Sequence, residues 1–404
     1  MTEVEVPILI VGGGASGLAT SLGLSQLGVD HLLVERHPST SHAPKAHILN
    51  QRTMEIFRQL GIAERVYDEG SSGEFLQRAT WRTSFGGDES SDGQAFATVD
   101  AWGGGEHAAV AAAVSPAPAC SCHQIKLEPL LDEMAQKVSP RQLRFGTEMV
   151  DLVAHDDHVE VLIRDRETGS EETVRARYVV AADGGKCIGP KLGAEMVGSR
   201  NLQDNVSLHF SADLSEYVDD GTVLNWIINP GSSESFGLGS GVVVPVGRGR
   251  HSQEWVLHQS FPPDEGDPNV ENAVARMRRL LKIGDTEVAV HQLNRWKLES
   301  VLADRFREGR VFFVGDAAHR HPPTIGIGMN SAFGDVSNLV WKLAAVVNGA
   351  ADEALLDTYE AERRPVIERN IDCANTTYYS HMLVNVALGL MPGMEPVQRD
   401  AAFA

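Results

Sequence analysis

The apolar positions of the first 35 residues predict a strand, a helix and a second strand. Residues 6–12 (VPILIVG) are a short apolar run that ends in glycine, which is typical of a buried parallel strand. Leucines recur at helical spacing from Ala15 to Leu27, and Gly28 ends that run. Residues 31–35 (HLLVE) predict the second strand. Strand, glycine turn, helix and strand in this order form a βαβ unit.

The rest of the chain contains helical periodicity, strand-like runs and one long alternating region. Helices are predicted at residues 51–67, 124–137, 329–348 and 352–377. Strand-like runs lie at 148–154, 158–164, 173–181 and 311–315. From about 203 to 300 the pattern alternates, with candidate antiparallel strands at 206–210, 223–227, 241–245, 254–258 and 288–292 and one helix at 268–282. Residues 69–118 are rich in Gly, Ser and Ala and predict an irregular loop beside a pocket.

Composition and charge narrow the class of protein. The chain has 404 residues, 42% of them hydrophobic, and a formal net charge of −20, so a nucleic acid is not an expected partner. Its four cysteines fit reduced thiols rather than a disulfide framework or a zinc site. The apolar residues 6–24 follow two glutamates and contain glycines, so we do not interpret them as a signal peptide. We expect no membrane span and a cytoplasmic enzyme.

The glycines after the first predicted strand have the spacing of a dinucleotide-binding turn. Gly12, Gly14 and Gly17, with Ala15 and Ser16 between the last two, form G-x-G-x-x-G. In such a turn the first glycine permits the tight bend, the second lets the backbone approach a pyrophosphate, and the third lets helix and strand pack closely. Glu35 ends the second strand, where a carboxylate can bind a ribose hydroxyl. This unit alone does not distinguish FAD from NAD.

A second motif near residue 316 identifies a family. Val314-Gly-Asp-Ala-Ala-His-Arg-His-Pro-Pro323, Gly326-Ile-Gly-Met-Asn330 and Asn338-Leu-Val-Trp-Lys342 follow one another here. Together they resemble the second FAD motif of the flavin-dependent aromatic hydroxylases (class A flavoprotein monooxygenases). The His-Arg-His-Pro-Pro version is similar to the phenol hydroxylase and chlorophenol monooxygenase branch. The resemblance runs from residue 6 to about 370 and is thin between 65 and 118.

The resemblance implies roles for individual residues. Asp316 would bind the ribityl chain, Pro323 would lie against the flavin, and backbone N–H groups near Met329 and Asn330 would face its N1–O2 edge. The set of expected cofactor residues is Gly12, Gly14, Ala15, Ser16, Gly17, Glu35, Arg36, Lys45, Gln124, Asp183, Asp316, Pro323, Gly326, Gly328, Met329 and Asn330.

Two of these positions lie in segments that depart from the family pattern. Asp183, in a middle Asp-Gly motif linked to NAD(P)H use, is followed by Cys187 and Pro190 where Ser and Arg are usual. Lys45 stands where the family has Arg. The first departure puts the nicotinamide contacts in question.

The resemblance also implies the fold. We expect an α/β protein with a Rossmann-like FAD-binding domain and an inserted, mainly antiparallel substrate sheet, as in p-hydroxybenzoate hydroxylase. The FAD-binding domain would comprise residues 1–72, 119–200 and 301–380, and the substrate domain 73–118 and 201–300. Residues 381–404 would form a tail without the thioredoxin-like domain of larger relatives, so the chain is a short member or a fragment. A homodimer is also implied.

The family reaction determines which catalytic residue to look for. NADPH or NADH reduces non-covalently bound FAD, and O₂ then forms a flavin C4a-hydroperoxide that oxygenates an electron-rich ring. Removing the proton of a phenol, whose pKa is about 10, makes its ring more nucleophilic. His47 matches the position near the substrate and is our candidate base. The alternative is a His47 that is merely packed or solvated.

Three further residues are candidates for the substrate pocket. His209 and Trp226 lie in the alternating strands, where core packing is the alternative, and Pro322 lies in the second motif. The histidine spacing predicts no metal site. Two rival functions stay open. One is a same-fold monooxygenase acting on a polycyclic natural product by hydroxylation, epoxidation or Baeyer–Villiger chemistry. The other is a non-catalytic FAD-binding redox module.

Overall fold

The chain divides into two compact units, each built from several segments. The computed structural model describes residues 2–138, 142–229, 240–260 and 269–387. Unit 1 comprises Met1–Val66, Gln124–Ser199 and Ser300–Ala374, and unit 2 comprises Tyr67–His123, Arg200–Glu299 and Asn375–Ala404. β11 (Met196–Ser211) and β15 (Ala289–Ala303) contribute residues to both units.

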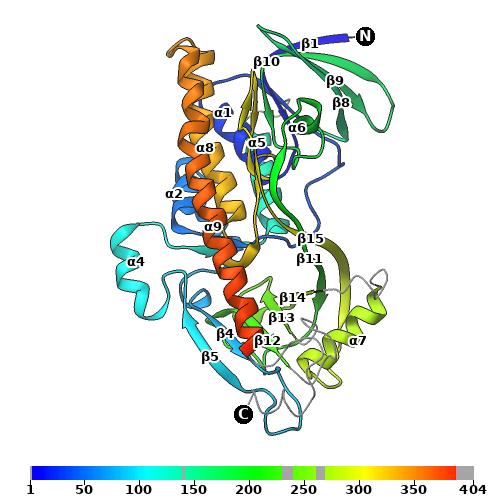
Figure 1. Cartoon of the computed structure of the whole chain (residues 1–404), viewed down its shortest axis with the longest axis vertical. Coiled ribbons are helices and arrows are strands. Elements are labelled where there is room, and N and C mark those ends of the chain that lie inside the picture. The colour runs from blue at the N-terminus through cyan, green and yellow to red at the C-terminus, as the bar shows by residue number, and fades with distance from the viewer. Residues whose placement is uncertain (1, 139–141, 230–239, 261–268, 388–404) are drawn as a thin grey trace. The chain divides into compact units, whose positions relative to one another are not determined.

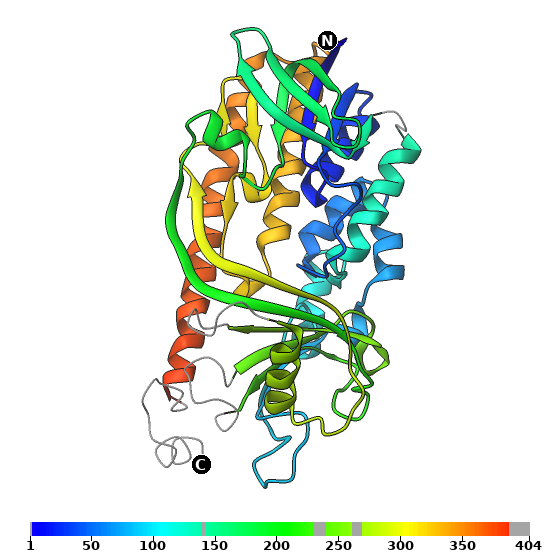
Figure 2. The same cartoon turned by 90° about the vertical axis from the view of Figure 1, so that its right-hand side faces the viewer.

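Unit 1 is an α/β layer around a mostly parallel sheet. Its strand order is β16-β17-β10-β1-β2-β7, and β9 and β8 extend it beside β10 as a hairpin that Figure 2 shows from a second side. The strands are β1 (Thr2–Val11), β2 (His31–Glu35), β7 (Leu143–Phe145), β8 (Thr147–Ala154), β9 (Val159–Asp165), β10 (Glu171–Ala181), β16 (Arg307–Glu308) and β17 (Val311–Phe313). β1, β2, β7, β10 and β17 pair in parallel. Residues 8–11 and all of β2 are buried, as an apolar run in a parallel sheet requires.

The helices of unit 1 pack beside this sheet, and α1 contacts both α5 and α8 (Figure 1). They are α1 (Ala15–Gln26), α2 (Gln51–Gln59), α5 (Gln124–Val138), α6 (Ile188–Lys191) and α8 (Gly328–Val347). α3 (Ala63–Glu69) and α9 (Thr358–Ala387) each continue beyond unit 1. Among the described helices, none combines the length and apolar composition that a bilayer crossing requires.

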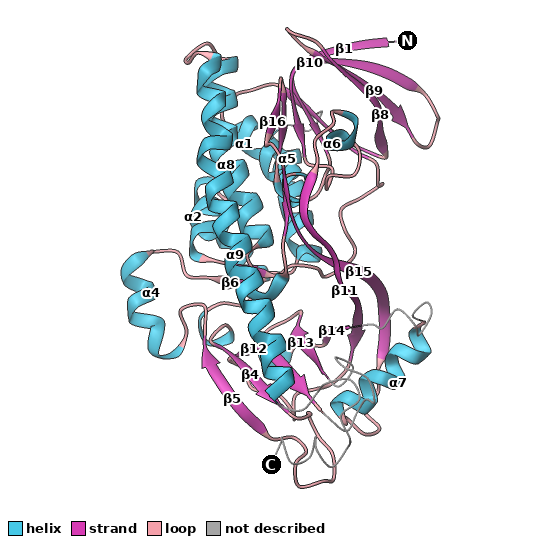
Figure 3. Ribbon diagram, in the orientation of Figure 1, coloured by secondary structure: helices cyan, strands magenta, loops and turns pink. Residues whose placement is uncertain are grey.

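Unit 2 is built on a second sheet with the order β15-β11-β14-β13-β12-β4-β5. Its other strands are β4 (Arg78–Arg82), β5 (Ala95–Asp100), β12 (Thr222–Ile228), β13 (Ser240–Pro245) and β14 (Glu254–Ser260). α7 (Val270–Leu281) covers one face, where Met277, Leu280 and Leu281 join Phe210 and Trp255 in a buried core (Figure 3). The opposite face therefore carries the side chains that alternate with this core.

Two local predictions were wrong. Residues 69–118 are not an irregular loop, because they contain β4, β5 and α4 (Ala108–Val114). Residues 51–67 form two helices rather than one, since Gly61 adopts a left-handed φ of +69° between α2 and α3. β12 pairs in parallel with β4, while the β12–β13, β13–β14 and β11–β14 pairs are antiparallel, as expected of a mainly antiparallel sheet. The helix predicted to end at 377 extends to Ala387, and residues 388–404 of the expected tail lie outside the described residues.

Candidate functional site

Three motifs that are far apart in the sequence meet at the carboxyl ends of β1, β10 and β17. A Cβ built at Gly12 would lie 2.2 Å from the carbonyl oxygen of Ala182, and one at Gly185 would lie 3.1 Å from that of Asp316. One at Gly315 would lie 2.7 Å from the Ser16 hydroxyl oxygen. The two Asp-Gly segments and the first glycine turn therefore form one continuous surface. In open α/β sheets, ligands bind at this edge.

The first turn has the geometry that its glycines predict. Gly12 has a φ of +115°, and a Cβ at Gly17 would lie 1.8 Å from the carbonyl oxygen of Gly12, so neither position accepts a side chain. A Cβ at Gly14 would meet only the carboxylate of Glu128, at 3.6 Å. Ala15 begins α1 directly after this turn. The backbone at Gly14 is thus open enough for an incoming phosphate to approach the helix N-terminus.

Glu35 closes the turn from the end of β2. One of its carboxylate oxygens accepts a hydrogen bond from the Gly13 N–H (2.7 Å), and the other accepts one from the His37 N–H (2.8 Å). A carboxylate offers about four acceptor sites, so lone pairs remain for a ribose hydroxyl. Arg36, the next residue, is exposed.

Glu128, four residues after Gln124 in α5, is a buried carboxylate at this turn. Its oxygens accept hydrogen bonds from the N–H groups of Ala15 (3.1 Å) and Ser41 (2.9 Å), and from the side-chain amide of Gln124 (2.6 Å). A negative charge at a helix N-terminus is favourable. Glu128 therefore joins the first turn, the segment around residue 41 and α5, and it positions Gln124 beside the turn.

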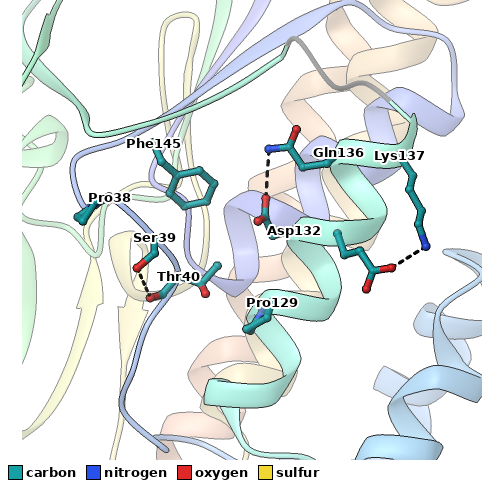
Figure 4. Close-up of a pocket in the computed structure, with 9 residues that line it drawn as sticks. Pro38, Ser39, Thr40, Pro129, Asp132, Gln136, Lys137 and Phe145 are labelled. Atoms are coloured by element: carbon teal, nitrogen blue, oxygen red, sulfur yellow. Dashed lines mark hydrogen bonds and ion pairs between the residues drawn. The ribbon is translucent and has the colours of Figure 1, made fainter.

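A cavity of about 560 Å³ opens next to the end of β2. It is lined by residues 38–40 and by one side of α5 and Phe145, and Figure 4 shows Phe145 and Asp132 pointing toward it. Burial raises the pKa of Asp132, against the effect of its hydrogen bond with Gln136. The cavity is on unit 1, beside the segment that follows Glu35.

The N-terminus of α8 is the second helix end at the site. Its first turn, Gly328-Met-Asn-Ser, contains no acidic residue, and its N-cap residue, Ile327, makes no side-chain capping hydrogen bond. Gly326, with a φ of +62°, turns the chain into the helix, Met329 is buried, and Pro323 is exposed just before the turn. The positive end of the helix dipole and its unpaired N–H groups are thus available to an anionic group.

Asn330 ties the segment after His47 to α8. Its side-chain oxygen accepts hydrogen bonds from the Asn50 N–H (2.9 Å) and the Thr53 hydroxyl (2.6 Å). Its side-chain nitrogen donates to the carbonyl oxygens of Ile48 (2.8 Å) and Gly326 (2.7 Å). All four hydrogen bonds of the amide are used, so Asn330 acts here as a clamp through its side chain. His47 itself is half-buried and Lys45 is exposed.

A buried ionic network lies behind the second motif. Asp335 is fully buried and accepts hydrogen bonds from the Gly315 N–H (3.1 Å), His319 Nε2 (2.7 Å) and Arg363 Nε (2.9 Å). Burial acts to raise the pKa of Asp335, but His319 and Arg363 outweigh it and hold that pKa below its usual value. Burial next to His319 lowers the pKa of His321 to about 4, so its imidazole is neutral at pH 7.

Two predicted residues have carboxylates in different environments. Asp183 accepts hydrogen bonds from the N–H groups of Gly185 (3.1 Å), Cys187 (2.7 Å) and Ile188 (3.0 Å), so it stabilises the turn before α6. Asp316 is exposed at the carboxyl end of β17. Asp316 is therefore open to a ligand, while Asp183 is occupied by its own loop.

The predicted pocket residues of unit 2 lie on the face of the sheet away from α7. Trp226 stacks on Trp81 with ring centroids 6.4 Å apart and meets the edge of His381 at 4.9 Å. His209 is buried, and its Nε2 is 2.8 Å from a carboxylate oxygen of Glu254. Neither residue belongs to the core cluster beneath α7. Pro322, the third predicted pocket residue, is buried in unit 1.

The same face carries a group that the sequence did not single out. His258 and Trp296 both hydrogen-bond to the Ser207 hydroxyl, at 2.7 Å and 2.8 Å. Burial lowers the pKa of His258 to about 4, so it is a neutral side chain among aromatic rings. Strand register places Ser207 opposite His258, and His258 opposite Val242, which pairs with Trp226. The alternation of residues 254–258 predicted the strand that carries His258. It did not predict which strands pair with it, and this pairing is what brings His258 to Ser207 and Trp296.

Comparison with known proteins identifies the family. A family model described as an FAD binding domain matches residues 5–374. The chain belongs to this family. The predicted cofactor, FAD, and the predicted membership among the flavin-dependent aromatic hydroxylases are thereby confirmed.

Two curated relatives and one solved structure illustrate the similarity. The 2,4-dichlorophenol 6-monooxygenase of Cupriavidus pinatubonensis is 35% identical over 392 residues, which cover 96% of this chain and 64% of that protein. A putative polyketide hydroxylase of Streptomyces coelicolor is 37% identical over 90% of this chain and 56% of that protein. The chain thus spans somewhat less than two thirds of the length of these relatives.

The flavin-dependent monooxygenase PieE, solved with FAD and substrate, matches with a TM-score of 0.91 and 37% identity over 100% of this chain and 68% of that one. The predicted fold class is confirmed by this match.

Proposed function

We propose that the chain catalyses FAD-dependent hydroxylation of a phenolic aromatic compound, with NADPH or NADH as reductant and O₂ as oxygen source. The observation that carries the proposal is the meeting of the three motifs at one sheet edge, where the backbone at Gly14 is open. The dichlorophenol monooxygenase, to which the chain is similar, supports the substrate class.

The described residues fit FAD at this edge. The turn at Gly14 and the start of α1 would hold the pyrophosphate, Glu35 a ribose hydroxyl and Asp316 the ribityl chain. The uncapped N-terminus of α8 would stabilise negative charge on the ring. Once reduced, the flavin supplies the activation of O₂ and the electrophilic oxygen atom.

The residues of the chain would prepare the substrate. His47 would accept the phenol proton, since the ordinary histidine pKa of about 6.5 suits reversible proton transfer at neutral pH. Hydrogen bonds of the Asn330 side chain attach the segment that carries His47 to α8. They therefore fix the position of this segment relative to the N-terminus of α8. Arg36, Lys45 and Gln124 would contact FAD from the rim of the site.

A second candidate function is hydroxylation of a polycyclic aromatic compound. The face of the unit 2 sheet that carries Trp226 and His258 supports it. Trp226 and His258 lie on strands two apart, which corresponds to about 10 Å at the usual strand spacing. One phenol ring does not cover this width. The similarity to a putative polyketide hydroxylase also supports this candidate.

One experiment tests both candidates. FAD-loaded protein is mixed with NADPH or NADH and a panel that contains simple phenols, chlorophenols and hydroxylated anthraquinones, and the product mass is recorded. Phenol-stimulated oxidation with a product heavier by one oxygen supports the main proposal, and stimulation by the fused rings alone supports the second. Bound FAD with no oxygenated product from any compound would favour the non-catalytic redox module.

A further inference from the structure

Three side chains with metal-ligand chemistry meet on one face of the unit 2 sheet. His291, His209 and Glu254 come from β15, β11 and β14, which are consecutive in the strand order. Register places Ser211 opposite Glu254 and His209 opposite Val256, so His209 and Glu254 are diagonal neighbours on the same face. The three residues are separated by about 40 residues in sequence at each step, and only the pairing of strands unites them.

The distances suit a small cation. His209 Nε2 and a carboxylate oxygen of Glu254 are 2.8 Å apart, and the rings of His209 and His291 have centroids 4.8 Å apart. One ligand atom from each of the three residues lies within 4.8 Å of the others. An ion with bonds of about 2.1 Å separates its ligand atoms by roughly 3 to 3.5 Å. Because Glu254 and His291 are exposed at their ends, side-chain rotation can close the remaining distance.

The donor set has a definite preference. Two imidazoles and one carboxylate suit late first-row divalent ions, and three protein ligands leave an open position for water. The imidazole must be neutral to coordinate a metal.

We propose that His209, Glu254 and His291 form a binding site for Zn²⁺ or a similar divalent transition-metal ion. The hydroxyl of Ser211 lies 2.6 Å from His291 Nε2, so His291 would coordinate through Nδ1 or give up this hydrogen bond. Coordination by His209 Nε2 requires its proton to reside on Nδ1 and replaces the hydrogen bond to Glu254. A bound ion links β11, β14 and β15. No step of the flavin chemistry proposed above passes through this ion.

A simpler interpretation is a hydrogen-bonded His209–Glu254 pair. That pair and the separate hydrogen bond between Ser211 and His291 account for each residue by itself, but not for the meeting of two imidazoles and a carboxylate from three strands. The chain also offers an internal control, because His155, His158 and Glu160 form a similar group on the β8–β9 hairpin of unit 1. In that group the ligands come from one hairpin, and His155 and Glu160 are both partly exposed. An ion there would link no separate segments.

The test is metal binding by the full, FAD-loaded chain after treatment with EDTA. Zn²⁺ affinity is measured by competition with a chromophoric chelator, and Co²⁺ is used as a spectroscopic probe. Wild-type protein should show Co²⁺ bands of nitrogen and oxygen coordination and a higher melting temperature with Zn²⁺. His291→Ala and Glu254→Gln should each lose at least about tenfold in affinity, since even outer-shell changes cost 10- to 100-fold. His155→Ala should retain the wild-type affinity for this site.

Circular dichroism and FAD content verify that each variant is folded. Wild-type protein with neither Co²⁺ bands nor Zn²⁺ retention would overturn the proposal. So would His291→Ala and Glu254→Gln variants that bind like wild type, or a thiolate-to-cobalt charge-transfer band, which would assign the ion to cysteine.

Discussion

Replacing Asp335 with Asn removes the charge at the centre of the buried network behind the second motif. The carboxylate accepts hydrogen bonds from the Gly315 N–H, His319 and Arg363, and it is 0% exposed. The side-chain amide of Asn has the same size but only one acceptor oxygen. Its NH₂ group would face donors of the network, to which it cannot form a hydrogen bond. Breaking a buried ion pair from one side costs about 3 to 5 kcal/mol, because the partner charge stays buried. We therefore expect Asp335→Asn to lower the free energy of unfolding by about 3 to 5 kcal/mol.

Urea denaturation of FAD-free protein at pH 7 measures this change without a contribution from ligand binding. Asp357→Asn is the matched control, since Asp357 forms an ion pair at the surface, where such pairs contribute about 0 to 1 kcal/mol. The pKa of Asp335 is lowered by folding, so its stabilisation is fully present above the unfolded pKa of about 3.9 and is lost as the pH falls below it. A variant within 1 kcal/mol of wild type, or an unchanged acid transition, would refute this reasoning.

Three further predictions concern the turn, the base and the thiols. Gly17→Ala places a Cβ 1.8 Å from a backbone carbonyl oxygen, so FAD titration should show a loss of binding, while Gly189→Ala, whose Cβ has 4.0 Å to its nearest neighbour, should bind as wild type. His47→Gln should slow hydroxylation by about 10²- to 10⁴-fold and remove a limb of the pH profile, whereas a wild-type rate at every pH would exclude His47 as the base. Burial beside Cys122 raises the pKa of Cys120 to about 12, so iodoacetamide at pH 8 should modify exposed Cys373 well before Cys120 by peptide mass spectrometry, and equal rates would contradict that burial.

The sequence predicted the parts of the fold that depend on local pattern. The strand at 6–12, the helix after it and Glu35 at the end of the next strand are all local signals, and the structure has each of them. The region 69–118 failed because β4 is only five residues long and β5 is mostly exposed, so neither has a strong alternation. β4 pairs with β12, which lies more than 100 residues away, and β5 pairs in turn with β4.

Residues of the candidate site could be predicted only where they belong to a recognisable sequence motif. Asp316 and Gly12 follow strands in recognisable patterns, and the structure brings their segments together. The clamp formed by the Asn330 side chain was not visible, because its partners Asn50 and Thr53 are about 280 residues distant. The group of His209, Glu254 and His291 depends on strand order and register, which spacing alone does not encode.

The proposed function requires that the chain transfer one oxygen atom from O₂ to an aromatic ring. FAD-loaded protein is reduced with one equivalent of NADPH in the presence of a responsive phenol, exposed to ¹⁸O₂ and quenched, and the product is analysed by mass spectrometry. If the chain is a hydroxylase, the product carries one ¹⁸O atom and forms in proportion to the NADPH consumed. Unchanged phenol with hydrogen peroxide as the only product, or a hydroxyl group that carries oxygen from water, would contradict it.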